Sequence, residues 1–257
     1  RSRGLGDVYK RQLEYRVKPL SAQRNQPTLA QIFIAEIFGT WALTLFGPAS
    51  VITLISILGG GPAALFGIGA TFGFIVMIMI YTLGHISGTH INPSVTVALA
   101  VIGRVPARLV GPYIAAQIIG SIIAGLCLYG FYPVTGKAVH FGSTLPGTGV
   151  GDGAAVIIEL ILTMWLLFVI MGVAVDKRAP AGWAGFSIGM IVAADIWIGG
   201  PLTGASMNFA RSLGPAIAAA IAGDLLPLSK VWIYLIGPII GGIIGAALYE
   251  YIFKPAK

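Results

Sequence analysis

Long apolar segments alternate with short polar connections along the chain. Each of six such segments is close to the roughly 20 residues that an α-helix needs to cross the hydrocarbon core of a bilayer. They cover residues 29–50, 62–84, 108–131, 153–175, 183–201 and 229–253. The pattern predicts an all-α membrane protein with six transmembrane helices.

Two further apolar stretches are too short to cross a bilayer, and each starts at an Asn. One lies between the second and third predicted spans, the other between the fifth and sixth. They begin with the runs Asn92-Pro93-Ser94 and Asn208-Phe209-Ala210. Asn is a strong helix N-cap because its side-chain oxygen accepts a hydrogen bond from the first turn, and Pro suits the first helical position. We expect two half-helices whose capping Asn residues keep both side-chain N–H donors free.

Three pairs of markers recur at nearly one spacing and divide the chain into two halves. The pairs are Glu36 and Glu159, Asn92 and Asn208, and Tyr113 and Tyr234, which lie 123, 116 and 121 residues apart. Three spans in each half give the halves opposite orientations in the membrane. The half-helices would then enter from opposite faces and meet near the midplane, as broken helices do in inverted-repeat transporters.

The repeat predicts a simple division of the chain. We expect a cytoplasmic tail (1–28), a first repeat (29–131), an outer connecting loop (132–152), a second, inverted repeat (153–253) and a second cytoplasmic tail (254–257). We predict no chemistry in the connecting loop. Residues 1–12 lack the apolar core and cleavage pattern of a secretory signal, and they are set aside because an expression-derived origin fits them.

Composition and charge agree with a multi-pass membrane protein. Only 10% of the 257 residues are charged, against roughly 25% in soluble domains. The net charge of +7 does not indicate nucleic acid, because the basic residues lie in the gaps between apolar spans. With a cytoplasmic N-terminus, thirteen of the sixteen lie inside, and only Lys137, Arg211 and Lys230 lie outside. The positive-inside rule therefore predicts that both termini are cytoplasmic. We expect the membrane to be the plasma membrane.

Glu36 and Glu159 lie within predicted spans, where a charge is costly and faces the bundle interior. A structural role, in which each accepts hydrogen bonds from loop N–H groups, is favoured over a proton relay because no ionisable ladder links them. His90 is interpreted as a loop-bonding residue that could border a pore. No metal-ligand cluster or cofactor motif is present, and the lone Cys127 can form no internal disulfide.

The two Asn boxes, in the settings 84–96 and 208–215, resemble those of the aquaporins, the major intrinsic protein channels. The resemblance covers about residues 29–253 and implies a homotetramer with one water or glycerol pore per subunit. The family's usual box is Asn-Pro-Ala, whereas this chain has Ser94 and Phe209 in place of one Ala and one Pro. Phe209 lacks the preset backbone of Pro, so we expect packing to hold the second half-helix.

The resemblance also places the family's selectivity filter on Phe72, Ile196, Ala205 and Arg211. Strict water channels carry His at the position of Ile196 and often Cys at that of Ala205. Glycerol channels carry Gly and Phe there, with Trp at the position of Phe72. This chain fits neither set, and Ile196 is similar to the archaeal branch of the family. Ser212 stands where glycerol channels usually have Asp, which favours water.

The sequence therefore predicts a passive channel for water, with slower permeation of glycerol or other small neutral solutes and exclusion of protons and ions. It is not expected to be an enzyme, and its partners are water, small neutral solutes and the lipid bilayer. Two alternatives remain, a coupled secondary transporter and a membrane scaffold with a closed pore. Asp195 has no assigned partner and is expected near the outer mouth or at a helix contact.

Overall fold

A computed structural model describes residues 26–253, so the predicted tails at 1–25 and 254–257 lie outside the described part. Within that part, six helical segments are long and apolar enough to cross a membrane. They are Leu29–Ile57 (α2 and η1), Pro62–Ser87 (α3), Ala107–Phe131 (α5), Asp152–Val175 (α6 and η3), Ala184–Thr203 (α7) and Leu226–Phe253 (α9, α10 and η4). The six predicted spans are confirmed, with somewhat longer bounds.

Three of the spans consist of more than one helical element. The first joins α2 (Leu29–Val51) to the π-helix η1 (Ile52–Ile57), and the fourth joins α6 (Asp152–Ile170) to the π-helix η3 (Met171–Val175). The sixth contains the short α9 (Leu226–Lys230), then α10 (Ile233–Leu248), and ends in the π-helix η4 (Tyr249–Phe253).

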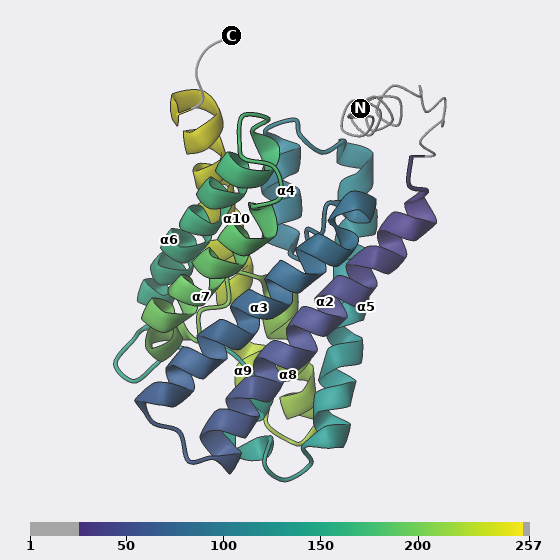
Figure 1. Ribbon diagram of the computed structural model, residues 1–257. Coiled ribbons are helices and arrows are strands. Elements are labelled where there is room, and N and C mark those ends of the chain that lie inside the picture. The colour runs from purple at the N-terminus through teal and green to yellow at the C-terminus, as the bar shows by residue number, and fades with distance from the viewer. Residues whose placement is uncertain (1–25, 254–257) are drawn as a thin grey trace, which may run out of the picture.

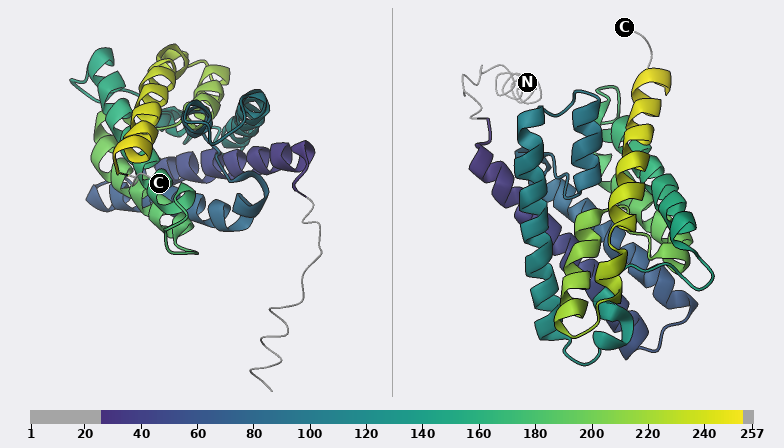
Figure 2. Two further views of the ribbon diagram at one scale, coloured as in Figure 1. Left: turned by 90° about the horizontal axis from the view of Figure 1, so that it is seen from above. Right: turned by 180° about the vertical axis from the view of Figure 1, so that it is seen from behind.

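The two short helices lie at opposite ends of the bundle (Figure 1). They are α4 (Pro93–Val101) and α8 (Phe209–Ile221), and their N-termini lie in the interior of the molecule. The start of α2 and the end of η4 reach the same end of the bundle, as the view from behind also shows (Figure 2). The arrangement is the inverted repeat that the marker spacing predicts.

Helices pack closely where the two repeats carry small residues. A Cβ atom added to Gly120 in α5 would lie 2.4 Å from the carbonyl oxygen of Ile37 in α2. In the second repeat, one added to Gly241 in α10 would lie 2.0 Å from the carbonyl oxygen of Leu160 in α6. Corresponding helix pairs are therefore in backbone contact, because only glycine allows this approach.

Glycine also ends α3 (Pro62–Ser87) and α7 (Ala184–Thr203), the helices that lead into the two Asn boxes. Gly88 and Gly204 follow these helices in the left-handed conformation, with φ of 81° and 79°. Glycine adopts this conformation without the steric penalty that a Cβ atom brings. In each repeat the chain thus makes the same turn at the end of the helix and runs back into the bundle.

The connecting loop is more ordered than a simple loop. It contains the 3₁₀ segment η2 (Lys137–Gly142), in which His140 and Phe141 have φ of 49° and 56°. Phe141 is buried against Ile52 and Leu128, which holds this strained backbone in place. The segment η2 is therefore packed against η1 and α5.

Candidate functional site

Two cavities meet in the interior of the bundle. One, of about 220 Å³, is lined by both box Asn residues, by the loops that precede them and by apolar side chains of the surrounding helices. The other, of about 540 Å³, lies between these helices and η2. Phe72, Ile196 and Arg211 line both cavities, so the junction between the cavities is at these three side chains. Ala205 lines the first cavity beside them.

Each box Asn caps its own half-helix and also contacts the opposite repeat. The Oδ1 of Asn92 accepts a hydrogen bond from the N–H of Ser94 at 2.8 Å, and that of Asn208 accepts one from Arg211 at 3.2 Å. The Nδ2 of Asn92 donates to the carbonyl of Met207, and the Nδ2 of Asn208 donates to that of Ile91, both at 2.8 Å. The prediction of two free donors is therefore wrong, because one N–H of each amide is used between the repeats.

The loops before the boxes have an uncommon backbone conformation. Thr89 and Ile91 in the first loop have φ of 50° and 44°, and Ala205 and Met207 in the second have 44° and 55°. The left-handed conformation costs a non-glycine residue roughly 1–2 kcal/mol. Such strain persists only where surrounding interactions hold the backbone, which is typical of functional sites.

A buried glutamate supplies these interactions in the first repeat. Glu36 accepts hydrogen bonds from the hydroxyl of Ser87 at 2.6 Å and from the N–H groups of His90 and Ile91 at 2.9 and 2.7 Å. A fourth bond comes from the Nε2 of Gln117 at 2.8 Å. The carboxylate thus holds the loop in the conformation that places Asn92 in the cavity.

The second repeat uses Glu159 in the same way. Its carboxylate accepts from the hydroxyl of Thr203 at 2.6 Å and from the N–H groups of Ser206 and Met207 at 2.9 and 2.7 Å. Both glutamates are fully buried. These bonds favour the predicted structural role, since each carboxylate is engaged with its own loop.

His90 lies at the side of the first cavity. Its Nδ1 is 3.0 Å from the hydroxyl oxygen of Thr96, and its ring lies 4.6 Å from that of Tyr113. Its ring is thus bonded to α4, the half-helix that follows its loop, and also borders the cavity. The described residues contain no group of three or more His, Cys, Asp or Glu side chains that could hold a metal ion.

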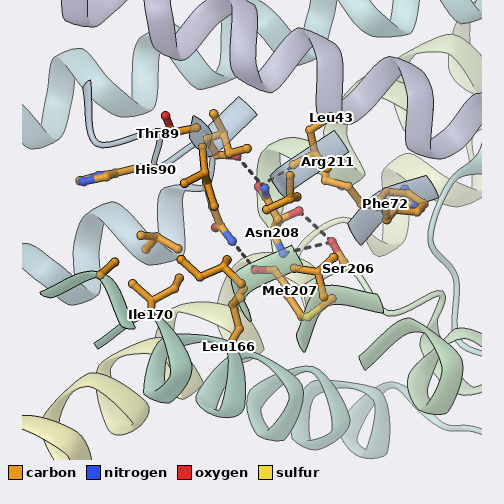
Figure 3. Close-up of a pocket in the computed structure, with 18 of the residues that line it drawn as sticks. Leu43, Phe72, Thr89, His90, Leu166, Ile170, Ser206, Met207, Asn208 and Arg211 are labelled. Atoms are coloured by element: carbon orange, nitrogen blue, oxygen red, sulfur yellow. Dashed lines mark hydrogen bonds between the residues drawn. The ribbon is translucent and has the colours of Figure 1, made fainter. Parts of the chain in front are cut away.

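Arg211 is the charged side chain at the junction of the two cavities. Its Nη1 donates to the carbonyl of Gly142 at 3.0 Å, and its guanidinium carbon lies 4.8 Å from the centre of the Phe72 ring. The Nε is buried with no hydrogen-bond partner among the described residues. Figure 3 shows Arg211 beside Asn208, with Phe72 at one end of the site and His90 at the other.

The connecting loop contributes to the site, contrary to the prediction that it carries no chemistry. The carbonyl of Gly142 bonds Arg211, and the hydroxyl of Thr144 lies 2.7 Å from that of Ser212. Ser212 in turn lies 2.5 Å from the hydroxyl of Ser206. The loop sequence gave no signal for these contacts, because a carbonyl acceptor can come from any residue and Thr is common in loops.

Two other predicted features have definite positions. Asp195 is buried on α7, lines neither cavity, and its Oδ2 has no hydrogen-bond partner among the described residues. Phe209 begins α8 without the help of Pro. The carbonyl of the next residue, Ala210, accepts a hydrogen bond from Ser121 of α5 at 2.5 Å, so contacts with a neighbouring helix hold the half-helix.

Comparison with known proteins places this geometry among membrane channels. The family described as Major intrinsic protein matches residues 23–249. A protein described as "Probable aquaporin AqpM" from Archaeoglobus fulgidus is 44% identical over 247 residues, which covers 88% of this chain and 98% of that protein. "Probable aquaporin NIP4-2" from Arabidopsis thaliana is 42% identical over 223 residues, which covers 87% and 75% of the two chains.

A solved structure has the same fold. The aquaglyceroporin from Plasmodium falciparum superposes with a TM-score of 0.78, covering 88% of this chain and 97% of that chain. Only 22% of the aligned residues are identical, so this likeness concerns the fold alone.

Proposed function

The chain belongs to the major intrinsic protein family and is a membrane channel rather than an enzyme, and on this premise we propose how water and small solutes pass through it. The route follows the two joined cavities past both box Asn residues. The observation that carries the proposal is the position of Asn92, Asn208 and Arg211 in one cavity whose other walls are largely apolar. Transport is passive, since water needs only brief hydrogen bonds along this route.

Polar groups on one side of the route would replace part of the hydration of each passing water molecule. Asn92 and Asn208 each keep one N–H donor after their bonds to the opposite repeat. Residues 88–91 and 205–207 of the strained loops line the same cavity, and we propose that backbone carbonyl groups of these loops add hydrogen-bond acceptors to the route. The apolar walls, among them Val95 and Leu166, limit binding, so that water can also leave.

We infer that protons and ions are excluded by positive potential. Each helix N-terminus carries roughly half a positive charge, and α4 and α8 both direct theirs toward the interior. Arg211 adds a full charge at the junction of the two cavities. An Arg together with the positive ends of half-helices is the arrangement for which aquaporins are the known example of cation and proton exclusion.

We assign the selectivity filter to Phe72, Ile196, Ala205 and Arg211. Water is expected to pass fast, and glycerol or similar neutral solutes slowly but measurably. Ile196 and Ala205 do not crowd the opening as imidazole and thiol groups would, yet they provide no second aromatic surface for a polyol. The filter is thus wide enough for a small solute without being matched to it.

We further propose a homotetramer in the plasma membrane with both termini in the cytoplasm. The family resemblance and the exposed bulky side chains of α6, such as Ile157 and Trp165, support the oligomer. The distribution of basic residues supports the orientation. A measurement of native mass in detergent tests the oligomer, and a fully active monomer would contradict it.

Osmotic shrinkage of proteoliposomes tests the function. We expect fast shrinkage in sucrose, slower re-swelling in glycerol, and no dependence of either on a proton gradient. A coupled transporter would respond to the gradient, and a closed scaffold would shrink no faster than protein-free liposomes. Arg211→Ala is expected to keep water flux while raising solute and proton leak, because it removes the charge and the bulk at the narrow point.

A further inference from the structure

Gly47 lies on the side of α2 that faces the passage formed by the two cavities. Leu43 and Val51, one turn before and one turn after Gly47, line the two cavities. Residues four apart lie on the same side of a helix, so Gly47 faces the passage as well. Yet Gly47 lines neither cavity and is buried.

The ring of Phe72 occupies the space in front of Gly47. A Cβ atom added at Gly47 would lie 2.1 Å from Cε1, 2.3 Å from Cζ and 2.6 Å from Cδ1 of this ring. Carbon atoms in contact normally lie about 3.5–4.0 Å apart. Gly47 therefore forms a recess in α2, and the ring edge of Phe72 enters it.

The Phe72 ring that enters the recess also lies beside Arg211. The guanidinium carbon of Arg211 is 4.8 Å from the centre of the same ring. The next residue of α2, Pro48, contacts the loop that holds Arg211: a Cβ atom added at Gly142 would lie 2.6 Å from the carbonyl oxygen of Pro48. The carbonyl of Gly142 accepts the hydrogen bond from Arg211. The Gly47-Pro48 step thus contacts the Phe72 ring directly and is connected to Arg211 through Gly142.

We propose that Gly47 is a specificity-determining residue of the channel, because its recess withdraws the Phe72 ring from the passage and so sets the width of the filter. The inference rests on the proposed function of the filter. A larger residue at position 47 fills the recess and moves the ring away from α2, toward Arg211 and Ile196. The opening narrows for solutes larger than water, although no filter side chain has changed.

The test compares osmotic water flux and glycerol uptake in proteoliposomes of Gly47→Ala, Phe72→Leu and the double variant. Gly47→Ala is expected to lower the glycerol-to-water ratio about tenfold, the usual effect of one methyl group in a tight apolar site. Adding Phe72→Leu removes the ring that the new methyl group meets, so the double variant is expected to return to the ratio of Phe72→Leu alone.

Gly67→Ala is the matched control on α3. Its added Cβ would lie 2.8 Å from Cδ1 of Leu54, the far end of a flexible side chain, and the ratio is expected to remain that of the wild type. If Gly47→Ala keeps the wild-type ratio, or if the double variant keeps the defect of Gly47→Ala, the proposal is wrong.

Thermal unfolding gives a readout that does not depend on transport. If Gly47→Ala fails to assemble, the double variant must recover assembled protein, and failure to do so also overturns the proposal. A wild type without water flux would contradict the proposed function instead. Recovery of thermal stability in the double variant would still show that the Phe72 ring packs in the recess at Gly47.

Discussion

The side-chain amide of Asn92 donates a hydrogen bond to the main-chain carbonyl of Met207, which belongs to the other repeat. The reciprocal bond runs from Asn208 to Ile91 at the same distance of 2.8 Å. Each Asn therefore joins the cap of its own half-helix to the loop before the other. The centre of the channel is one hydrogen-bonded unit to which both halves contribute.

Asn92→Ala is expected to destabilise the protein and lower water flux, because it removes the cap of α4 and one bond between the repeats. Loss of the cap alone typically costs about 1 kcal/mol. Asn92→Ser separates the two effects, since its hydroxyl oxygen can cap α4 while the amide that bonds Met207 is lost. We expect Ser to retain more thermal stability than Ala. Equal unfolding temperatures for the two variants would show that the cap contributes nothing.

Substitution of Gln for the buried glutamates is expected to affect the two repeats unequally. One carboxylate oxygen of Glu159 accepts only the N–H of Met207, whereas each oxygen of Glu36 accepts two hydrogen bonds. The NH2 of a Gln side chain cannot accept a hydrogen bond, so the donors that face it lose their acceptor, and each buried donor left without an acceptor costs about 1–3 kcal/mol. Glu36→Gln should therefore lower the unfolding temperature more than Glu159→Gln, and the opposite order would contradict this reading of the loops.

The pair formed by His140 and Asp224 is expected to make the stability of the protein depend on pH, with a sign that follows from the pKa of Asp224. The Nδ1 of His140 lies 2.5 Å from the Oδ2 of Asp224, and this hydrogen bond lowers the pKa of Asp224 from its ordinary value of 3.8. A lowered folded-state pKa stabilises the protein fully above the unfolded value, and the stabilisation is lost as pH falls through the folded value.

We therefore expect the unfolding temperature of the wild type to fall below about pH 4 relative to that of Asp224→Asn, whose side chain has no such proton to bind. Scanning calorimetry between pH 3 and pH 6 measures the difference. Asp152→Asn is the control, because it removes another exposed partner of a basic residue, Lys230, and leaves His140 unchanged. If the wild type and Asp224→Asn differ by the same amount at every pH, the linkage is absent.

The orientation can be tested at two exposed residues. Lys137 lies in η2, and Lys177 follows η3 at the opposite end of α6. With Cys127 replaced by Ser, single Lys137→Cys and Lys177→Cys variants are expected to react with an impermeant thiol reagent from outside and from inside, respectively. Labelling of both from one side would contradict the inverted repeat.

The sequence was sufficient for the spans, the half-helices and the glutamates, because each leaves a local trace. Apolar length predicts a span, Asn before a short apolar run predicts a capped half-helix, and a Glu within a span predicts a buried acceptor. These signals recur once per repeat, and the recurrence made them specific. Glu36 and Glu159 each accept hydrogen bonds from N–H groups of the loop in their own repeat, and the loop-supporting role stays a prediction.

Features that depend on tertiary approach left no such trace. The bond from Asn92 to Met207 requires two loops 115 residues apart to meet, and its acceptor is a backbone carbonyl. In the sequence, Gly47 could not be distinguished from the other glycines of the helices, so its recess could not be predicted. Gly142 contributes a carbonyl whose role depends on where the connecting loop packs, which no pattern of residue types specifies.

Selectivity provides the last prediction. Ile196 is 2% exposed and lines both cavities with Phe72 and Arg211. Ile196→His brings a polar ring to the narrow point, where it can hydrogen-bond water but also reduces the room for a carbon backbone. We expect glycerol uptake to fall about tenfold or more and water flux to change much less, since steric selection at a tight site is typically of this size.

Val192→His is the control for this substitution. Val192 lies one turn before Ile196 on α7 and lines only the first cavity, so it does not belong to the junction of the two cavities at Phe72, Ile196 and Arg211. A His there is expected to lower water and glycerol flux together, because it obstructs the route without altering the filter. The two ratios, measured in the same liposomes, therefore separate obstruction from selection. If Ile196→His leaves the glycerol-to-water ratio unchanged, or if Val192→His changes it as strongly, Ile196 does not set selectivity and the narrow point lies elsewhere along the passage.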